Sequence, residues 1–473
     1  MNLGPLDAVI VLLFVAAIFA LGFSARLKSN TTLQFIAAGR ALTLPVFVAT
    51  LVATWYGGIL GVGETVSWYG LGSWVLIGVP YYVFALIYAL VLAKRVRSAD
   101  QISIPERIAN SWGKGPGLIA AALVFLLAIP AAHVLMLGTL TQSLTGWSLP
   151  VSVAVATLVG SLFLYKGGLL ADARVSLLAF VMMYVGFAAI AVFCLLNYPI
   201  GETWKQFAGT EKMTWDGGAG ILTVVSWFIL GAWTLIDPGF HQRVASAKDP
   251  ATGKKGVVVA IVCWIVFDVL SITTAMYALA LVDPLPENKL LLYPILGNQV
   301  LPQGLKAVFF CGMLGTILSG MVGYALVSGA TIGREFVCRA LGISDEATAA
   351  NLARAGILLA CLVAIPLSLL FKSVVLLWLL WAGAVIGALL IPTLVSYLSK
   401  QPGRIPPKAV SVSMLSGFII SVAWLAWTMS RGQGQTVNLA EGVEFDIGTL
   451  LPGVAVGALT LVVGTAVLGR SRK

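Results

Sequence analysis

Apolar segments long enough to cross a bilayer recur along almost the whole chain. An α-helix rises about 1.5 Å per residue, so about 20 apolar residues cross the hydrocarbon layer of a membrane. Charged residues make up only 10% of the sequence, against about 25% in soluble domains. This pattern predicts an all-α integral membrane protein with about 13 transmembrane helices. The predicted spans are 6–25, 42–67, 72–93, 116–141, 147–165, 173–197, 217–238, 256–282, 304–333, 351–371, 373–398, 407–429 and 447–469.

The basic residues are distributed unevenly over the loops that these spans define. Of the 29 Lys and Arg residues, 23 fall on the side of the C-terminus and 6 on the other side. The positive-inside rule therefore predicts a cytoplasmic C-terminus and an outside N-terminus, in a multi-pass protein of the cell (inner or plasma) membrane. The net charge of +10 thus indicates membrane topology, and we expect no nucleic-acid partner. Arg243, Lys248, Lys254 and Lys255 are interpreted as ordinary charges of the cytoplasmic side.

The segments between the spans are too short for a catalytic domain. The sequence has no phosphate-binding loop, no metal-ligand cluster and no pairing of a nucleophile with a base. We therefore predict that the protein is not an enzyme and needs no cofactor. The chain, 1–473, is treated as a single transmembrane domain.

The span 42–67 is interrupted near its middle by glycines. Residues 53–64 contain Gly57, Gly58 and two further glycines, and end at Glu64. Each glycine weakens a helix by about 1 kcal/mol, and a break in hydrocarbon is tolerated only where it lines a protein cavity. The span 217–238 also combines a tryptophan with a glycine interruption. Glycine can also serve close helix packing, but two breaks at corresponding places favour a binding site.

The order of the spans suggests an internal repeat. With the first span (6–25) set aside, 42–197 and 217–398 each hold five spans, and 407–469 holds two extra helices. An odd number of spans per group means that the second group enters the membrane from the opposite side. Such inverted repeats are typical of secondary transporters, which bind their substrate near the membrane midplane.

Aromatic residues crowd the middle of the interrupted spans. Tryptophan is usually enriched at membrane interfaces, so its presence beside helix breaks indicates either ordinary packing or an aromatic-walled pocket. The absence of a cationic group there disfavours a strongly anionic substrate. The candidate substrate-binding residues are Trp55, Tyr56, Gly57, Gly58, His133, Trp227 and Trp233.

Several motifs resemble those of the sodium:solute symporter family. Residues 35–40 read Phe-Ile-Ala-Ala-Gly-Arg, similar to the Phe-x-x-Ala-Gly-Arg of that family, and 53–64 are followed by Tyr-Gly-Leu at 69–71. Gly-Gly-Leu at 167–169, Gln-Arg at 242–243 and a hydroxyl-rich ninth span complete the resemblance. It implies a LeuT-type fold with a five-plus-five inverted repeat. It also implies Na⁺-coupled symport of a small polar organic solute by alternating access.

By this resemblance, Na⁺ binds where the first core helix (42–67) meets the eighth (304–333). The implied ligands are backbone carbonyls of the first helix and carbonyl and hydroxyl groups of the eighth; no other metal is expected. The family usually has two adjacent hydroxyl residues in the eighth helix, whereas this chain has Ser followed by Gly. The candidate ion-binding positions are Leu51, Thr54, Thr316, Ser319 and Gly320.

The departure at Gly320 leaves other coupling schemes open. Glu64 and Asp268 are the carboxylates deepest in the apolar spans, and a charge at the bilayer centre is a functional hypothesis by default. Glu64 could instead cap the restarted half-helix, and Asp268 could be a structural hydrogen-bond acceptor. A proton-coupled or sodium-independent solute transporter that uses these carboxylates is therefore one alternative, and a transporter-like solute sensor is another.

Overall fold

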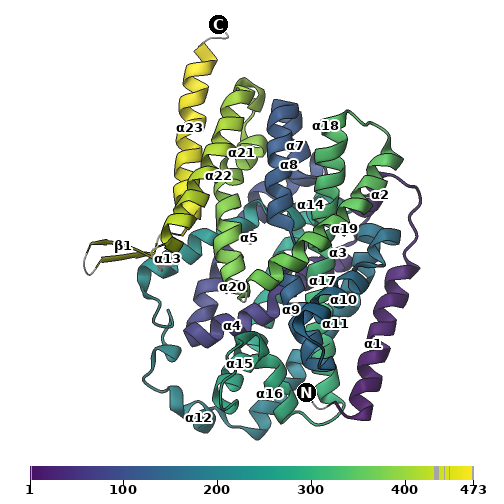
Figure 1. The fold of residues 1–473 in the computed structure, drawn as a ribbon, viewed down its shortest axis with the longest axis vertical. Helices are drawn as coiled ribbons and strands as arrows, with labels where there is room; N and C mark the ends of the chain where they lie inside the picture. The colour runs from purple at the N-terminus through teal and green to yellow at the C-terminus, as the bar shows by residue number, and fades with distance from the viewer. Residues whose placement is uncertain (2, 372, 431–435, 441–442, 447, 471–473) are drawn as a thin grey trace.

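The computed structural model describes the chain except residues 2, 372, 431–435, 441–442, 447 and 471–473. The long helices run side by side in one bundle, with α1 at one edge and α23 at another (Figure 1). The first half contains α1 (Pro5–Ser24), α2 (Thr32–Ala37), α3 (Leu44–Trp55), α4 (Ile59–Tyr69), α5 (Val79–Ile87), α6 (Ala93–Ser98), α7 (Ile104–Trp112), α8 (Lys114–Ala128), α9 (Ala131–Thr145), α10 (Leu149–Ser161), α11 (Leu164–Asn197) and α12 (Ile200–Thr203).

The second half contains the remaining helices and one hairpin. They are α13 (Gly220–Leu230), α14 (Pro238–Ser246), α15 (Pro250–Leu281), α16 (Leu292–Val300), α17 (Leu305–Ala330), α18 (Arg339–Leu341), α19 (Glu346–Leu370), α20 (Val374–Leu376), α21 (Gly383–Leu398), α22 (Pro407–Ser430), β1 (Thr436–Ala440), β2 (Val443–Asp446) and α23 (Leu450–Arg470). The strands pair antiparallel, with Thr436 opposite Asp446 and Val437 opposite Phe445. This hairpin between α22 and α23 is a small addition to the predicted all-helical architecture.

The helices confirm the predicted spans. Within the described residues, 11 helical stretches are long and apolar enough to cross a membrane, and α10 and α21 are shorter apolar helices. Together they account for the thirteen predicted segments, although the first residue of the last segment, 447, lies outside the described residues. The predicted division into two repeats stays a prediction.

The two helices predicted to hold the ion lie at the centre of the bundle. In Leu44–Gly72 and Leu305–Leu341, 89% and 78% of the most apolar part is buried, whereas in Pro5–Ser24 only 22% is. Hydrophobic burial between helices contributes little in lipid, so central helices are held by close packing and hydrogen bonds. The polar residues of these two spans therefore lie inside the protein and away from lipid.

The predicted break in the first core helix is real but narrower than expected. A 3₁₀ turn at Tyr56–Gly58 joins α3 to α4. Gly61 and Gly63 lie inside α4, where an added Cβ would come within 2.7 Å of Trp378 and 2.8 Å of Tyr293. These two glycines therefore serve close helix packing, which was the other interpretation of the glycine cluster.

A second break lies in the corresponding span. There α13 ends at Leu230, a 3₁₀ turn runs over Gly231–Leu235, and α14 begins at Pro238. The side chain of Asp237 accepts a hydrogen bond of 2.6 Å from the backbone N–H of Phe240 and so caps α14. An N-cap of this kind satisfies a backbone donor that the break would leave unpaired in the membrane.

Two of the sequence motifs, far apart in the chain, contact each other. The Gln242 amide donates to the Ile36 carbonyl at 3.0 Å. Leu42 forms an isolated parallel bridge with Ala247, through hydrogen bonds to the backbone on either side of it. The segment that precedes α3 and the segment that follows α14 are thus joined by backbone pairing. This contact holds the ends of both broken spans together.

Candidate functional site

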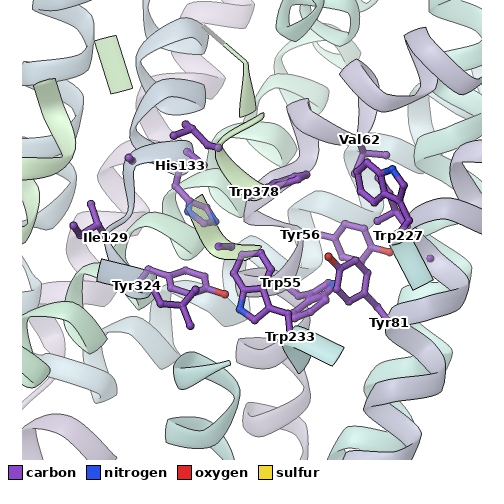
Figure 2. A pocket seen from close by; sticks show the side chains of 18 of the residues that line it. Trp55, Tyr56, Val62, Tyr81, Ile129, His133, Trp227, Trp233, Tyr324 and Trp378 are labelled. Atoms are coloured by element: carbon purple, nitrogen blue, oxygen red, sulfur yellow. The ribbon is translucent and has the colours of Figure 1, made fainter. Parts of the chain in front are cut away.

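A cavity of about 130 Å³ lies at the level of the two helix breaks. Its wall is rich in aromatic residues, and the residues that form it come from eight of the helical spans. His133 and Tyr324 lie at one end of the cavity, Tyr81 and Trp227 at the other, and Trp55 and Trp233 between them (Figure 2). The residues that line it include Trp55, Tyr56, Gly58, Tyr81, Tyr82, His133, Trp227, Trp233, Asp268, Tyr324 and Trp378.

The cavity contains most of the predicted substrate-binding residues. Six of the seven candidates line it, and the seventh, Gly57, lies directly behind its wall. Trp55 is held by ring contacts with Tyr81 at 4.9 Å between centroids, nearly perpendicular, and with Trp264 at 5.2 Å. Aromatic pairs at such distances are favourable in tilted or edge-on arrangements. The wall is therefore built from rings that hold one another in place.

Asp268 on α15 presents a carboxylate to this cavity. It accepts hydrogen bonds from the hydroxyl of Tyr56, at 2.6 Å, and from that of Tyr82. Gly78 makes room for it, because a Cβ there would lie 2.8 Å from the carboxylate oxygen. No ion pair links Asp268 to a basic side chain in the part of the chain that the structure describes. The carboxylate thus joins three segments of the bundle and has phenol donors but no counterion.

Glu64 has a different role from Asp268. Its carboxylate accepts the backbone N–H groups of Val374, at 3.1 Å, and Val375, at 3.3 Å. These residues begin α20, so Glu64 caps a helix of another part of the chain instead of its own half-helix. Glu64 does not line the cavity. The two deep carboxylates identified in the sequence therefore have different surroundings: Asp268 lines the cavity, and Glu64 caps α20.

The opposite end of the cavity is formed by His133 and Tyr324. The two rings stack with centroids 5.1 Å apart and planes 26° apart. The Tyr324 hydroxyl donates to Asp237 at 2.7 Å, on the oxygen that does not cap α14. His133 follows the interruption between α8 and α9 at Pro130. The second helix break and the cavity are thus connected through Tyr324.

The structure explains why residue 320 is a glycine. An added Cβ on Gly320 would lie 2.8 Å from the Cα of Gly57 and would overlap the His133 ring. The break in the first core helix and the eighth core helix therefore meet backbone to backbone. A second hydroxyl cannot be accommodated there without movement, so Gly320 can offer an ion only its carbonyl oxygen.

Behind the break, hydroxyl groups from two other helices converge on Ser319 of α17. Its Oγ lies 3.3 Å from the Thr54 hydroxyl and 2.8 Å from the Ser176 hydroxyl. One turn away, the Thr316 hydroxyl donates to the Ala53 carbonyl at 3.0 Å. Thr54, Thr316 and Ser319 lie close to this contact between the two helices, and Leu51 is buried one turn before Thr54. Ser176 was not predicted as a site residue.

Arg243 closes this cluster into a ring of hydrogen bonds. Its Nη2 donates to the Thr54 hydroxyl at 2.6 Å and to the Asp172 carboxylate at 2.9 Å. Ser176 donates to the other oxygen of Asp172 at 3.1 Å. Because each hydroxyl has a single proton, the donors run from Arg243 through Thr54, Ser319 and Ser176 to Asp172. Every hydroxyl proton of the ring is then directed toward the carboxylate.

The interpretation of Arg243 as a cytoplasmic charge is wrong. The side chain is 1% exposed and Asp172 is fully buried, so the pair lies inside the protein. Taking two charges out of water is costly, and their attraction compensates only when the geometry is good and the remaining hydrogen bonds are satisfied. Lys248, Lys254 and Lys255 are exposed, and their place on the cytoplasmic side stays a prediction. The Gln-Arg motif and the position of Asp172 near the start of a span were the signals available in the sequence.

Sequence reasoning also missed part of the cavity wall. Tyr81, Tyr82, Tyr324 and Trp378 line it and were not among the predicted residues. Tyr81 and Tyr82 follow Pro80 in the middle of a span, and two adjacent phenols at that depth were a usable signal. The other two residues become neighbours of the break only through the packing of the helices.

The architecture is similar to that of two solved transporters. A Na⁺-coupled sialic acid symporter in a substrate-bound outward-open state has a TM-score of 0.78 at 13% identity, covering 99% of this chain and 98% of that chain. Mhp1, a nucleobase-cation-symport-1 family transporter in a closed conformation with bromovinylhydantoin bound, has a TM-score of 0.61 at 13% identity, covering 94% and 96%. At this identity the likeness shows the fold alone, which is LeuT-type as predicted.

The family is shown by the sequence. No functionally curated protein matches the chain significantly. Residues 35–401 match the profile of the family described as "Sodium:solute symporter family". This match covers more than half of the chain and contains the cavity, the two helix breaks and the ring around Ser319. The chain therefore belongs to the sodium:solute symporter family, a family of membrane transporters and not of enzymes.

Proposed function

We propose that this protein is a Na⁺-coupled symporter that imports a small polar organic solute by alternating access. The observation that carries the proposal is the convergence of hydroxyl groups from α3 and α11 on Ser319 of α17, next to an aromatic cavity. Transporters with interrupted helices hold Na⁺ with backbone and hydroxyl oxygens beside the break and bind the solute next to it. The cluster and the cavity supply both kinds of site.

The proposed Na⁺ ligands are the predicted ones, with the Ser176 hydroxyl in place of a hydroxyl at position 320. The carbonyls of Leu51, Thr54 and Thr316 and the hydroxyl of Ser319 provide oxygen ligands, and Gly320 can provide only a carbonyl. The Ser176 hydroxyl, 2.8 Å from that of Ser319, replaces the hydroxyl that position 320 lacks. Neutral oxygens suit a hard monovalent cation without adding a second buried charge.

Coupling follows from the position of the ion beside the break. An ion that ties α3 to α17 orders the turn at Tyr56–Gly58, which forms part of the solute cavity. The solute then binds more tightly when Na⁺ is present, and by linkage Na⁺ binds more tightly when the solute is present. Rocking of the segments 42–197 and 217–398 against each other would expose the site to either side in turn.

The test is solute uptake into proteoliposomes under an imposed Na⁺ gradient, with K⁺ replacing Na⁺ in the control. We expect accumulation only with the gradient, and a lower apparent Na⁺ affinity for Ser319→Ala and Ser176→Ala. An exposed serine, Ser430→Ala, is the matched control. Equal accumulation in Na⁺ and in K⁺ would reject sodium coupling.

A second candidate is sodium-independent transport in which Arg243 serves as the resident cation. The guanidinium donates to Thr54 at 2.6 Å, beside the Ser319 hydroxyl, and a cation already there disfavours a second one. This scheme predicts uptake that is unaffected by replacing Na⁺ with K⁺ and is lost in Arg243→Gln. If uptake of Arg243→Gln still depends on Na⁺, the resident-cation scheme is excluded.

Proton coupling through Glu64 or Asp268 remains a third candidate, favoured by the position of Asp268 in the cavity wall. It predicts uptake driven by a pH gradient alone and abolished by Asp268→Asn. Glu64 is a weaker candidate because its carboxylate caps α20 outside the cavity. If a pH gradient has no effect on uptake, this scheme is excluded.

We also propose that the C-terminus is cytoplasmic and the N-terminus outside. The uneven distribution of Lys and Arg carries this proposal, and contacts among residues assigned to the basic side support the grouping of these loops on one side of the membrane. Arg354 donates to Asn30, Lys166 to the Phe23 carbonyl and Lys114 to the Ala340 carbonyl. Accessibility of single cysteines to a membrane-impermeant reagent tests it, and labelling of a C-terminal cysteine from outside would overturn it.

A further inference from the structure

Asp268 is the single Asp or Glu side chain among the described residues that line the cavity, and no Lys or Arg lines it. A buried charge is normally paired with an opposite charge or a metal, because a lone charge in a medium of low polarity is costly. Here the two partners of the carboxylate are the phenols of Tyr56 and Tyr82, which donate hydrogen bonds but carry no charge. Among the described residues, the cavity therefore holds a carboxylate and no Lys or Arg side chain to balance it.

The other buried carboxylates near the centre have their own protein partners. Asp172 pairs with Arg243, and Asp237 caps α14 and accepts the Tyr324 hydroxyl. Glu64 caps α20. Asp268 differs from all three because it lines the cavity. A cation bound in the cavity is therefore within reach of this carboxylate.

The remainder of the wall suits an organic cation. Trp55, Trp227, Trp233 and Trp378 line the cavity together with Tyr81. The face of an indole or phenol ring attracts a cation, and cages of such rings recognise alkylammonium groups. In such a group, methyl or methylene groups surround the positive charge, and these alkyl groups pack favourably against an apolar wall. A metal ion would gain nothing from such a wall, since it needs several oxygen ligands.

The size of the cavity limits the ligand. An apolar cavity of about 150 Å³ holds a molecule as large as benzene, and this cavity holds about 130 Å³. A ligand of roughly six or seven non-hydrogen atoms fits that volume, which is the size of choline. A sugar or a nucleobase with a ribose exceeds it unless the cavity opens further.

We propose that the transported solute is a small organic ammonium compound, with its cationic group held between the Asp268 carboxylate and the surrounding tryptophan rings. This assignment rests on the proposed transport function and specifies its substrate class. The Tyr56 and Tyr82 hydroxyls position the carboxylate. The aromatic rings exclude water and select against anions and metal ions.

The test compares ligands of equal shape and different charge on the full-length protein. Isothermal titration calorimetry in detergent uses choline, tetramethylammonium and ethanolamine as cations, and 3,3-dimethyl-1-butanol as the uncharged isostere of choline. We expect at least one cation to bind, and choline to bind at least about tenfold more tightly than its isostere. Equal binding of choline and the isostere, or no binding of any of the three cations, overturns the proposal.

Variants show whether Asp268 is the counterion. Asp268→Asn should weaken binding of the cation at least about 30-fold, as expected when one partner of a buried charge pair is removed, and should leave the affinity for the isostere unchanged. Glu202→Gln, at an exposed carboxylate, should leave both affinities unchanged. A cation affinity that survives in folded Asp268→Asn overturns the assignment.

Uptake separates this proposal from the transport function on which it rests. Na⁺-driven uptake of an uncharged or anionic solute, with no uptake of ammonium compounds, would overturn the substrate class and leave the symport function standing. Cation binding that depends on Asp268, without any effect of a Na⁺ gradient on uptake, would support the substrate class and reject sodium coupling.

Discussion

The buried pair of Arg243 and Asp172 gives the sharpest test of how this core is held together. Replacing either residue alone leaves the other charge buried without its partner in the described structure. Breaking a buried ion pair in this way typically costs about 3–5 kcal/mol. Replacing both charges with neutral side chains of similar size is often close to neutral. The double variant Asp172→Asn/Arg243→Met should therefore be more stable than either single variant.

The expected shift in melting temperature follows from the chain length. The entropy of unfolding is about 2.1 cal/mol/K per residue, which for 473 residues amounts to about 1 kcal/mol/K. A loss of about 3–5 kcal/mol then lowers the melting temperature by about 3–5 °C in each single variant. The double variant should lose clearly less than either of them.

The assay is thermal unfolding of the purified protein, with all variants in the same detergent and at the same scan rate so that their melting temperatures can be compared. The exposed residues Arg95 and Asp100 provide matched controls. Arg95→Met and Asp100→Asn should each shift the melting temperature by no more than about 1 °C. If the losses of the two single variants simply add in the double variant, the pair is not energetically coupled and the reasoning is refuted.

Three further perturbations test other parts of the structure. Gly320→Ser supplies the second hydroxyl but overpacks the contact with the facing backbone, so it should lower the free energy of unfolding by about 1–3 kcal/mol and reduce uptake. Gly115→Ser is the control, because an added Cβ at Gly115 meets nothing within 4 Å. A Gly320→Ser variant with full stability and full uptake would contradict the packing argument. Glu64→Gln removes the charge that caps α20 and should cost about 1 kcal/mol in thermal unfolding without changing solute affinity; a large loss of affinity would place Glu64 in the binding site. Burial raises the pKa of Glu106, but the hydrogen bond and charge of Arg334 outweigh it and lower this pKa below its usual range. The ionised Glu106 therefore stabilises the fold fully above about pH 4.3, and this stabilisation is lost as the pH falls through the lowered pKa. Glu106→Gln should remove this part of the loss of stability in acid, and a pH profile of stability that is unchanged in the variant would exclude this role of Glu106.

The architecture of this protein follows closely from its sequence. Hydropathy placed all thirteen helical segments, since about 20 apolar residues in a row have few alternatives to a membrane helix. The glycines at 57 and 58 located the first break, and the tryptophans beside both breaks identified residues of the cavity. These features are local along the chain, so they can be recognised without knowledge of the neighbouring helices.

The roles of the polar residues could not be obtained in this way. Glu64 and Asp268 are both carboxylates in apolar spans, yet one caps α20 and the other faces the cavity. Arg243 sits among basic loop residues in the sequence but points into the core, where it meets Asp172. Which side of a helix faces a partner depends on the rotation and tilt of both helices, and small residues set that packing.

The sequence by itself thus determined that this chain is a multispanning transporter with a broken helix at its centre, because chain-local hydrophobicity and glycine content decide both properties. Only the tertiary structure decided what meets at the break. It brought Gly320 against Gly57, so that no second hydroxyl fits, and it supplied Ser176 and Arg243 from other helices. It also left the Asp268 carboxylate facing an aromatic cavity, with no counterion in the part of the chain that the structure describes. The physical reason is that partners for polar groups inside a membrane protein come from neighbouring helices, and their identity is fixed only when the helices pack.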